Sequence, residues 1–357
     1  MSTVAREIIW PRDNDILVRV VFLYVGQGAS AIVLGADGYT YKTILIDINL
    51  DRKNHGINVP RLMADLLKDE DNHLGVFLNT HPHNDHLSGV VELSDAVDIG
   101  EVWHSGHKPG KEHGDAYENL QKVIRKVRKA GGVEKKLEGS RSPNSIGEAE
   151  FYVLAPAEYV VDDIEEEPAE ERYRRIHEQC AVLKFGMGSK WIMVAGDADR
   201  DGWEKHITHY HSDRLQAVVL GAAHHGSRTF FRYDEDSDPY LDALQGIAPT
   251  YVVISAPRSD ESQWGHPHDD AVKFYADQVG GTDNVLHTGR QRYSFICDIF
   301  RDGEYTIQPD NGELVDLYDI GDEGDSDKGK AIGAPAIIGT RVNQRSMGAR
   351  RDAYIVD

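Results

Sequence analysis

The chain contains very little cysteine and no long run of apolar residues. Among its 357 residues only Cys180 and Cys297 are cysteines, which excludes a disulfide framework and a cysteine-rich zinc site. The longest apolar runs, such as Ala217–Leu220, have the length of a strand and fall far short of the roughly 20 residues that span a bilayer. The first residues also lack the basic start and apolar stretch of a secretory signal. We therefore expect a cytoplasmic protein that does not associate with membranes.

Basic side chains are scarce relative to acidic ones. The 39 Lys and Arg residues face 60 Asp and Glu residues, and the formal net charge is −21. An acidic surface repels polyanions and disfavours non-specific binding to nucleic acid. The basic stretch Lys122–Lys136 departs from this balance, and its simplest interpretation is a solvated face. The composition therefore argues against a general nucleic-acid-binding protein but leaves a local basic surface open.

Short segments rich in Val, Ile and Phe and bounded by Gly, Asp or Pro predict strands. They cover Ile16–Tyr24, Ser30–Leu34, Thr43–Ile48, Gly75–Asn79, Phe151–Ala155, Ala181–Phe185, Trp191–Ala195, Gln216–Leu220, Tyr251–Ser255 and Tyr293–Phe300. Helices are predicted over Arg61–Lys68, Tyr117–Ala130, Trp203–Tyr210, Pro239–Leu244 and Asp269–Asp277. Strict alternation of strand and helix is absent, which disfavours a doubly wound sheet. We expect an α+β fold in which two sheets pack face to face with helices outside.

The composition changes near the end of the chain. Residues 1–315 hold all the predicted elements, whereas residues 316–357 are acidic and polar with few large apolar side chains. Such a segment cannot bury enough surface to fold alone. We expect one domain over 1–315 and a flexible tail over 316–357, available to a protein partner. The oligomeric state is not specified by these patterns.

The most informative segment is Asn79–Gly89, which reads NTHPHNDHLSG. It places His-x-His-x-Asp-His directly after a predicted strand, and imidazole and carboxylate groups are ligands that zinc prefers. His81 and His83 face the same way in an extended segment, so they can bind one metal. Asp85 and His86 fall where the chain turns and can bind a second metal. A His-rich loop formed by chance is the alternative.

Three further clusters follow later predicted strands and supply more ligands. Asp197, in Ala-Gly-Asp-Ala, can bridge two cations, although Gly-Asp is also an ordinary turn. The pair His224 and His225, in His-His-Gly-Ser, offers imidazoles or is a surface pair. His266, in Gly-His-Pro-His, is the weakest of the three signals. Together they predict one edge of a sandwich lined with metal ligands.

These motifs, in the order GQG, LIDI, THPHNDHLSG, AGD, HHGS and GHP, resemble metallo-β-lactamase-fold proteins. Within that group the chain is similar to the hydrolase domain of the ComEC competence protein and its soluble stand-alone relatives. The resemblance covers roughly residues 16–303 and implies a four-layer αββα sandwich. Metal ligands implied by it are His81, His83, Asp85, His86, Asp197 and His225. Catalytic roles are implied for Asp85, His224 near a phosphate oxygen, and His266 facing the substrate, with Asp47 orienting the ligand loop.

The chain also departs from the family pattern. Many members place a further His between the first motif and the bridging Asp to complete the first metal site. His104, His107 and His113 are the candidates here, and water is the alternative ligand. The family's usual Asp before GQG is Tyr24, and Asp260–Trp264 replaces an Asn motif before GHP. These changes affect the expected substrate more than the expected metals.

A site of this kind predicts a hydrolase with two divalent metals, Zn²⁺ or Mn²⁺, that generate hydroxide from a shared water. No separate Ser or Cys nucleophile is needed. We expect a phosphodiester substrate, in DNA, RNA or a nucleotide, from the ComEC-like resemblance and the basic stretch Lys122–Lys136. A pocket lined by Trp103, Trp264 and Tyr233 would instead favour a small ester, lactone or amide. A metal-bound sensor or scaffold with little turnover is the third possibility.

Overall fold

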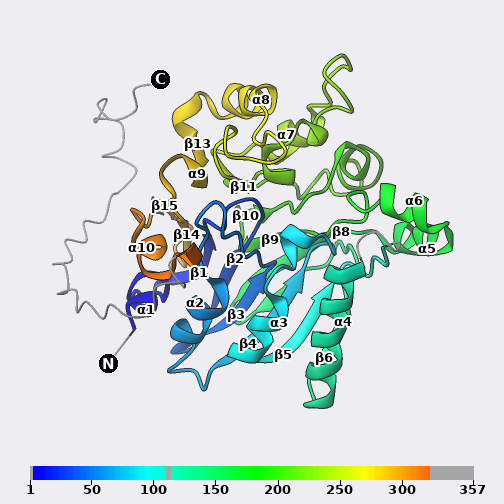
Figure 1. The fold of residues 1–357 in the computed structure, drawn as a ribbon. Helices are drawn as coiled ribbons and strands as arrows, with labels where there is room; N and C mark the ends of the chain where they lie inside the picture. Colours follow the sequence, from blue (N-terminus) through cyan, green and yellow to red (C-terminus); the bar gives the residue numbers. More distant parts are fainter. Residues whose placement is uncertain (1–2, 110–113, 322–357) are drawn as a thin grey trace.

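A computed structural model describes residues 3–109 and 114–321 and shows two sheets packed face to face. Helices cover the outer face of each sheet, so the layers run helix, sheet, sheet, helix (Figure 1). This arrangement confirms the predicted α+β sandwich. No helix in the described ranges is long and apolar enough to cross a bilayer.

The first sheet has eight strands in the order β15-β14-β1-β2-β3-β4-β5-β6. Its strands are β1 (Ile16–Phe22), β2 (Ala31–Asp37), β3 (Thr40–Ile46), β4 (His73–Asn79), β5 (Asp98–His104), β6 (Val133–Lys136), β14 (Phe295–Phe300) and β15 (Tyr305–Pro309). Neighbours are antiparallel from β15 to β3 and parallel from β3 to β6. The carboxyl ends of β3 and β4 therefore meet at the same edge of the sheet.

The second sheet has seven strands in the order β13-β12-β11-β10-β9-β8-β7. They are β7 (Asn144–Ile146), β8 (Ala149–Ala155), β9 (Val182–Met187), β10 (Lys190–Val194), β11 (Val219–Gly221), β12 (Tyr251–Ile254) and β13 (Val285–His287). Strands β10 to β13 are parallel, while β7 to β10 are antiparallel. The carboxyl ends of β10, β11 and β12 thus lie together with the amino end of β9.

The helices form two outer layers and a few connections. Helices α1 (Val4–Ile9), α2 (Val59–Leu66), α3 (Val90–Ala96), α4 (Gly114–Lys129) and α10 (Glu313–Tyr318) contribute to the apolar cluster outside the first sheet. The π-helix η3 (Gly202–Ile207), α7 (Asp242–Ile247) and α8 (Asp269–Val279) do so for the second sheet. Connecting helices are α5 (Glu158–Glu166), α6 (Ala169–Arg174), α9 (Thr288–Gln291) and the 3₁₀ turns η1 (Asn84–His86), η4 (Ala223–Gly226), η5 (Arg228–Phe230) and η6 (Thr282–Asn284). The start of α2 follows from its sequence, because Asn58 accepts a hydrogen bond from the Arg61 N–H and Pro60 occupies the first turn.

Trp103, which the sequence analysis placed in a pocket, lies in the core between the two sheets. Trp103, at the end of β5, stacks on Phe151 of β8 with ring centroids 5.7 Å apart. Tyr233 is exposed and donates a hydrogen bond to Asp201. Neither ring lines the cavity at the ligand edge, so the expectation of a pocket formed by Trp103 and Tyr233 is wrong. Trp103 packs in the core because its side chain is on the face of β5 that is directed at the second sheet.

The first residues of the expected tail are folded against the rest of the chain. Residue 316 falls inside α10, which contacts α2 through the buried ring of Tyr318. The backbone of Ile57 also forms a bridge with Asp319. The rest of the expected tail, residues 322–357, lies outside the described residues.

Candidate metal centre

The predicted ligands lie at the edge where the strand ends meet. The first motif follows β4, and η1 ends at His86. Asp197 follows β10, and the pair His224 and His225 lies in η4 after β11. Three segments that are distant in sequence thus deliver their polar side chains to one place, and the parallel neighbours β10 and β11 present their carboxyl ends together.

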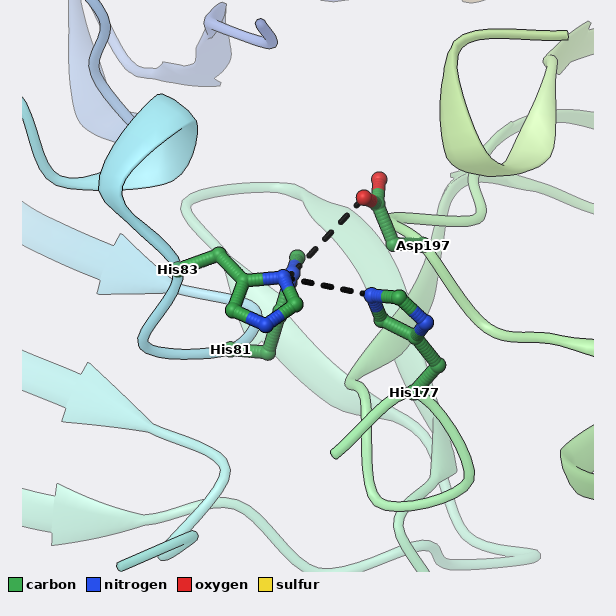
Figure 2. Close-up of side chains that lie close together, drawn as sticks. All are labelled: His81, His83, His177 and Asp197. Carbon is green, nitrogen blue, oxygen red and sulfur yellow. Dashed lines mark hydrogen bonds and ion pairs between the residues drawn. The ribbon is translucent and has the colours of Figure 1, made fainter. Parts of the chain in front are cut away.

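The first group of donor atoms consists of His81, His83, His177 and Asp197. Figure 2 shows the four side chains converging from two sides of the edge. His83 Nδ1 lies 3.0 Å from His81 Nε2 and 3.2 Å from His177 Nε2. An oxygen of Asp197 lies 3.7 Å from His81 Nε2. Three imidazoles and one carboxylate therefore surround a single point.

The second group consists of Asp85, His86 and His225. His225 Nε2 lies 3.3 Å from His86 Nε2 and 3.4 Å from Asp85 Oδ2. Asp197 also lies against this group, since its Oδ1 is 3.2 Å from His86 Nε2 and its Oδ2 is 3.5 Å from His225 Nε2. One buried carboxylate thus joins both groups.

The donor atoms fit two divalent cations. Tetrahedral nitrogen and oxygen ligands about 2.0–2.1 Å from zinc lie about 3.4 Å from one another. The separations given above run from 3.0 to 3.7 Å, and all donor atoms within each group lie within 4.8 Å of one another. Imidazole nitrogens that face one another so closely cannot all donate hydrogen bonds, whereas all can bind a cation. The residues therefore suit a pair of metal ions with Asp197 between them.

His177 is the candidate ligand that the sequence analysis missed. It precedes β9, and β9 is antiparallel to β10, so the start of β9 lies beside the end of β10 and Asp197. Two of the three proposed alternatives, His104 and His107, are not in the donor groups. His104 pairs with Glu134, and the ring of His107 lies 2.7 Å from Gln179 Oε1, whereas His113 lies outside the described residues. Because the amino end of an antiparallel neighbour lies at the same edge as the carboxyl ends of the other strands, residues before β9 were also candidates for ligands.

Burial makes this centre electrostatically unusual. His81 and His86 are fully buried, and Asp197 is 2% exposed. Burial, followed by the nearby His86, lowers the pKa of His81 well below its usual value. Burial would also lower the pKa of His86, but the carboxylates of Asp197 and Asp47 outweigh it and raise that pKa well above its usual value. A buried group of this composition gains much from a cation that neutralises its carboxylates and accepts its imidazole lone pairs.

Asp47 holds the ligand loop from behind. Its carboxylate accepts hydrogen bonds from the backbone N–H and hydroxyl of Thr80, at 2.7 and 2.6 Å, and from Asn79 Nδ2. Its Oδ2 also lies 2.7 Å from His86 Nδ1. The pairing leaves His86 Nε2 directed at the centre, which is the usual way in which a carboxylate orients a metal-binding imidazole. Asp47 is not itself in either donor group.

We therefore expect the Asp47→Ala substitution to reduce metal affinity or activity by about 10- to 100-fold without removing a ligand. Competition with a chromogenic chelator measures the affinity. Asp65→Ala is the control, because Asp65 is a structural carboxylate that accepts a hydrogen bond from the Tyr318 hydroxyl away from the centre. Equal metal affinity in the Asp47 variant and the wild type would contradict this role.

His224 lies beside the centre in a strained turn. Both His224 and His225 have positive φ angles, 49° and 55°, a conformation that costs free energy in non-glycine residues and often occurs at functional sites. The Nδ1 of His224 lies 2.9 Å from the hydroxyl of Thr229. Its Nε2 lies 3.7 Å from Asp197 Oδ2, and its ring is 4.3 Å from that of His177. Thr229 thus fixes the ring while Nε2 stays at the centre.

Replacing Thr229 by Val removes this hydrogen bond at nearly constant volume. We expect a decrease in kcat of about 2- to 10-fold with both metals retained, since one neutral hydrogen bond contributes roughly 0.5–1.5 kcal/mol. Thr229→Ser should restore most of the loss because it keeps the hydroxyl. Steady-state kinetics and metal analysis of the three proteins provide the comparison. A Ser variant as impaired as the Val variant would show that packing, and not the hydroxyl, matters.

His266 lies on the other side of His224 and His225. Its ring centroid is 5.3 Å from that of His224 and 6.2 Å from that of His225. Burial and these neighbouring imidazoles lower the pKa of His266 to about 3, so the ring is neutral at neutral pH. One ring nitrogen can then donate a hydrogen bond and the other can accept one, but the ring offers no positive charge to a substrate.

A cavity of about 690 Å³ opens over the centre. His83, Asp85, His177 and Asp197 line its floor, and the two histidines of η4 and His266 line it too. Residues from the loops around Gln27, Asp51 and Trp264 complete the lining. The volume suits a substrate of the size of a nucleotide or smaller bound at the donor groups.

The basic stretch Lys122–Lys136 is not part of this cavity. It belongs to α4 and β6, and its described members pair locally instead. Lys126 binds Asp95, Arg128 binds Glu134, and Lys135 lies over the Trp103 ring. These contacts support the interpretation of a solvated face and remove the stretch as an argument for nucleic acid at the centre.

Comparison with known proteins agrees with the fold and with the first motif. Residues 60–171 match the family model of the Metallo-beta-lactamase superfamily, a match that includes His81–His86 and ends before His177. The two-sheet sandwich described above has the architecture of a metallo-β-lactamase fold, and the matched segment carries the signature of a superfamily of metal-dependent hydrolases. No curated relative matches the chain significantly.

Similar solved structures are distant in sequence. A diphosphatase from the PhnP family is 14% identical, with a TM-score of 0.38, over 76% of this chain and 94% of that chain. The metallo-β-lactamase SMB-1 is 11% identical, with a TM-score of 0.29, over 78% of this chain and 92% of that chain. A superfamily protein from the archaeon Sulfolobus tokodaii is 14% identical, with a TM-score of 0.25, over 50% of this chain and 62% of that chain.

Proposed function

We propose that the protein is a binuclear metal-dependent hydrolase that cleaves a phosphodiester. The observation that carries the proposal is the pair of donor groups that share Asp197 on the floor of an open cavity. His81, His83 and His177 would hold one cation, and Asp85, His86 and His225 the other. When bound, such cations lower the pKa of a water and polarise a phosphoryl oxygen.

The chain's own residues would position the substrate and move protons. Asp85 is 29% exposed at its side chain, so its carboxylate can reach both the centre and the cavity. His224, held by Thr229, presents Nε2 beside the centre, where it can donate a hydrogen bond to a phosphate oxygen or to the leaving group. His266 remains neutral and can hydrogen-bond the substrate from the opposite wall.

A phosphodiester is favoured by the ComEC-like motifs and by the charge of the site. Two divalent cations would add four positive charges to the carboxylates of Asp51, Asp85 and Asp197 and the ammonium of Lys53 in the cavity lining. The sum leaves a positive cavity that suits an anionic group. A neutral ester gains less from this field than a phosphodiester does.

The second candidate is a small ester or lactone hydrolase. Trp264, 62% exposed, lines the cavity and offers an apolar face to an uncharged organic group. The same feature also fits an aromatic phosphodiester, so it does not separate the two by itself. A sensor or scaffold role would require the centre to bind metals without turnover.

Hydrolysis of bis(p-nitrophenyl) phosphate and of p-nitrophenyl acetate in Zn²⁺ or Mn²⁺ tests the proposal. We expect metal-dependent cleavage of the phosphodiester that is lost in the His83→Ala, Asp85→Ala double variant. Cleavage of the acetate alone would support the ester hydrolase instead. Two bound metals with cleavage of neither compound would contradict the proposed activity and favour a sensor or scaffold.

A further inference from the structure

The loop between β12 and α8 contains Asp260–Trp264, one of the places where the sequence departs from the metallo-β-lactamase-like pattern, and it carries an exposed tryptophan. The side chain of Trp264 is 62% exposed and lines the same cavity as the donor groups. An aromatic side chain that lines a cavity offers a large apolar contact area to a ligand bound there.

The ring is presented by an anchored turn. The hydroxyl of Ser262 donates to Gln27 Oε1 at 2.6 Å, and it accepts hydrogen bonds from the N–H groups of Trp264 and His266 at 3.2 and 3.0 Å. One side chain therefore ties the Trp264 loop to the Gln27 loop on the opposite sheet. A fixed aromatic face binds a flat ligand with less loss of conformational entropy than a mobile one.

A second aromatic residue lines the cavity near the metals. Tyr173 of α6 is 37% exposed, and its ring centroid is 6.4 Å from that of His83. Both aromatic side chains thus face a space whose floor is the candidate metal centre. A ligand with a flat ring and a phosphate can contact an aromatic side chain and the metals in the same cavity.

The small number of basic side chains in the cavity lining limits how many phosphates a ligand can place there. Among the described residues that form the cavity, Lys53 is the single Lys or Arg. A polynucleotide needs a series of cations along its backbone, because each phosphate contact contributes separately. One ammonium group and two metals suit one or two phosphates.

We propose that this cavity takes a small phosphodiester that carries a nucleobase, with the base stacked on Trp264 and the phosphate at the metals. This inference rests on the proposed hydrolase function and specifies its substrate class. A mononucleotide ester, a cyclic nucleotide or a dinucleotide fits this cavity, whereas long DNA or RNA does not. Stacking tolerates every base, so we expect little preference among them.

Two substrates with the same leaving group test whether Trp264 is a stacking platform for the base. Thymidine 5′-(p-nitrophenyl phosphate) carries a base, and methyl p-nitrophenyl phosphate does not. We expect wild-type kcat/KM to be higher for the thymidine compound by about 5- to 100-fold, mostly through a lower KM. In Trp264→Ala this ratio should fall toward one, and Trp264→Phe should retain much of it. Tyr39→Ala, at a fully exposed ring outside the cavity, should keep the wild-type ratio.

A ratio that is the same in wild type and Trp264→Ala would overturn the platform while leaving the hydrolase intact. Absence of cleavage of both compounds would instead contradict the proposed function. In that case calorimetric binding of thymidine 5′-monophosphate to the zinc-loaded 357-residue chain still tests the platform. At least about 5-fold weaker binding by Trp264→Ala supports it, and equal binding rejects it.

The length of the ligand is tested separately with a ten-nucleotide single strand. We expect its kcat/KM to be no greater than that of the mononucleotide ester and to depend weakly on salt. The slope of log kcat/KM against log salt concentration should stay near about −1, because one lysine lines the cavity. A slope steeper than about −3 would show an extended basic track and overturn the limit to small substrates.

Discussion

The Asp197→Asn substitution should remove at least one metal and lower activity by more than about 100-fold. Loss of a partner that merely orients a ligand costs about 10- to 100-fold, and Asp197 is placed as a ligand to both metals. Asparagine keeps the volume of the side chain but replaces one carboxylate oxygen by an NH₂ group, which donates hydrogen bonds and cannot bind a cation. Metal analysis of the dialysed protein and kinetics with bis(p-nitrophenyl) phosphate provide both readouts.

Asp199→Asn is the matched control for this experiment. Asp199 lies in the same turn and is also largely buried, which raises its pKa to about 6. Its carboxylate accepts a hydrogen bond from the Gly202 N–H at the start of η3 and belongs to neither donor group. We expect two metals and nearly full activity in this control. Two firmly bound metals in Asp197→Asn would contradict the shared-carboxylate arrangement.

The His177→Ala substitution should affect the two metals differently. His177 contacts His83, whereas Asp85, His86 and His225 form the other group without it. We therefore expect one metal per chain to be retained under limiting metal while the other is lost. Activity should fall by about 100-fold or more, since removal of a ligand exceeds the effect of removing an orienting partner. Titration with zinc, followed by isothermal calorimetry, separates the two binding events.

His104→Ala is the control for that prediction. From the sequence His104 was an equally good candidate for the missing ligand, but the structure pairs it with Glu134 at the end of β5 and β6. We expect this variant to bind two metals. A result in which His104→Ala loses a metal and His177→Ala does not would restore the alternative that the structure removed.

The metal motif was predictable because its signals are local. His81, His83, Asp85 and His86 lie within six residues after a strongly apolar strand, so the spacing alone indicates a metal site. Asp197 and the pair in η4 also follow apolar strands, and parallel neighbours bring their ends together. All ten predicted strands occur in the structure, which is why the two-sheet architecture could be expected.

His177 could not be placed in the same way. It is 94 residues from His83 and lies before a strand whose direction is set by its partner across the sheet. Five strands were also missed. Strands β13 and β15 have only three and five residues. Strands β5, β6 and β7 were missed because Asp98, Gly100 and Glu101 interrupt the apolar pattern of β5 and the other two are short and polar. Their conformation is decided by pairing with β4, β5 and β8 and not by local preference.

The Trp264 loop shows a different limit of the sequence. The sequence analysis grouped Trp103, Trp264 and Tyr233 as the lining of a pocket for a small ester, but Trp103 and Tyr233 lie elsewhere. Only the structure separates the ring that lines the cavity from those that pack in the core or bind a surface carboxylate. Substrate class therefore depends on side-chain direction, which spacing does not encode.

Anomalous diffraction from crystals of the zinc-loaded protein tests the central claim most directly. The account predicts two peaks at the strand-end edge: one among His81, His83 and His177, and the other among Asp85, His86 and His225. Asp197 should contact both. A single peak, or a peak bound by His104 or His107 in place of His177, would contradict the shared two-metal centre.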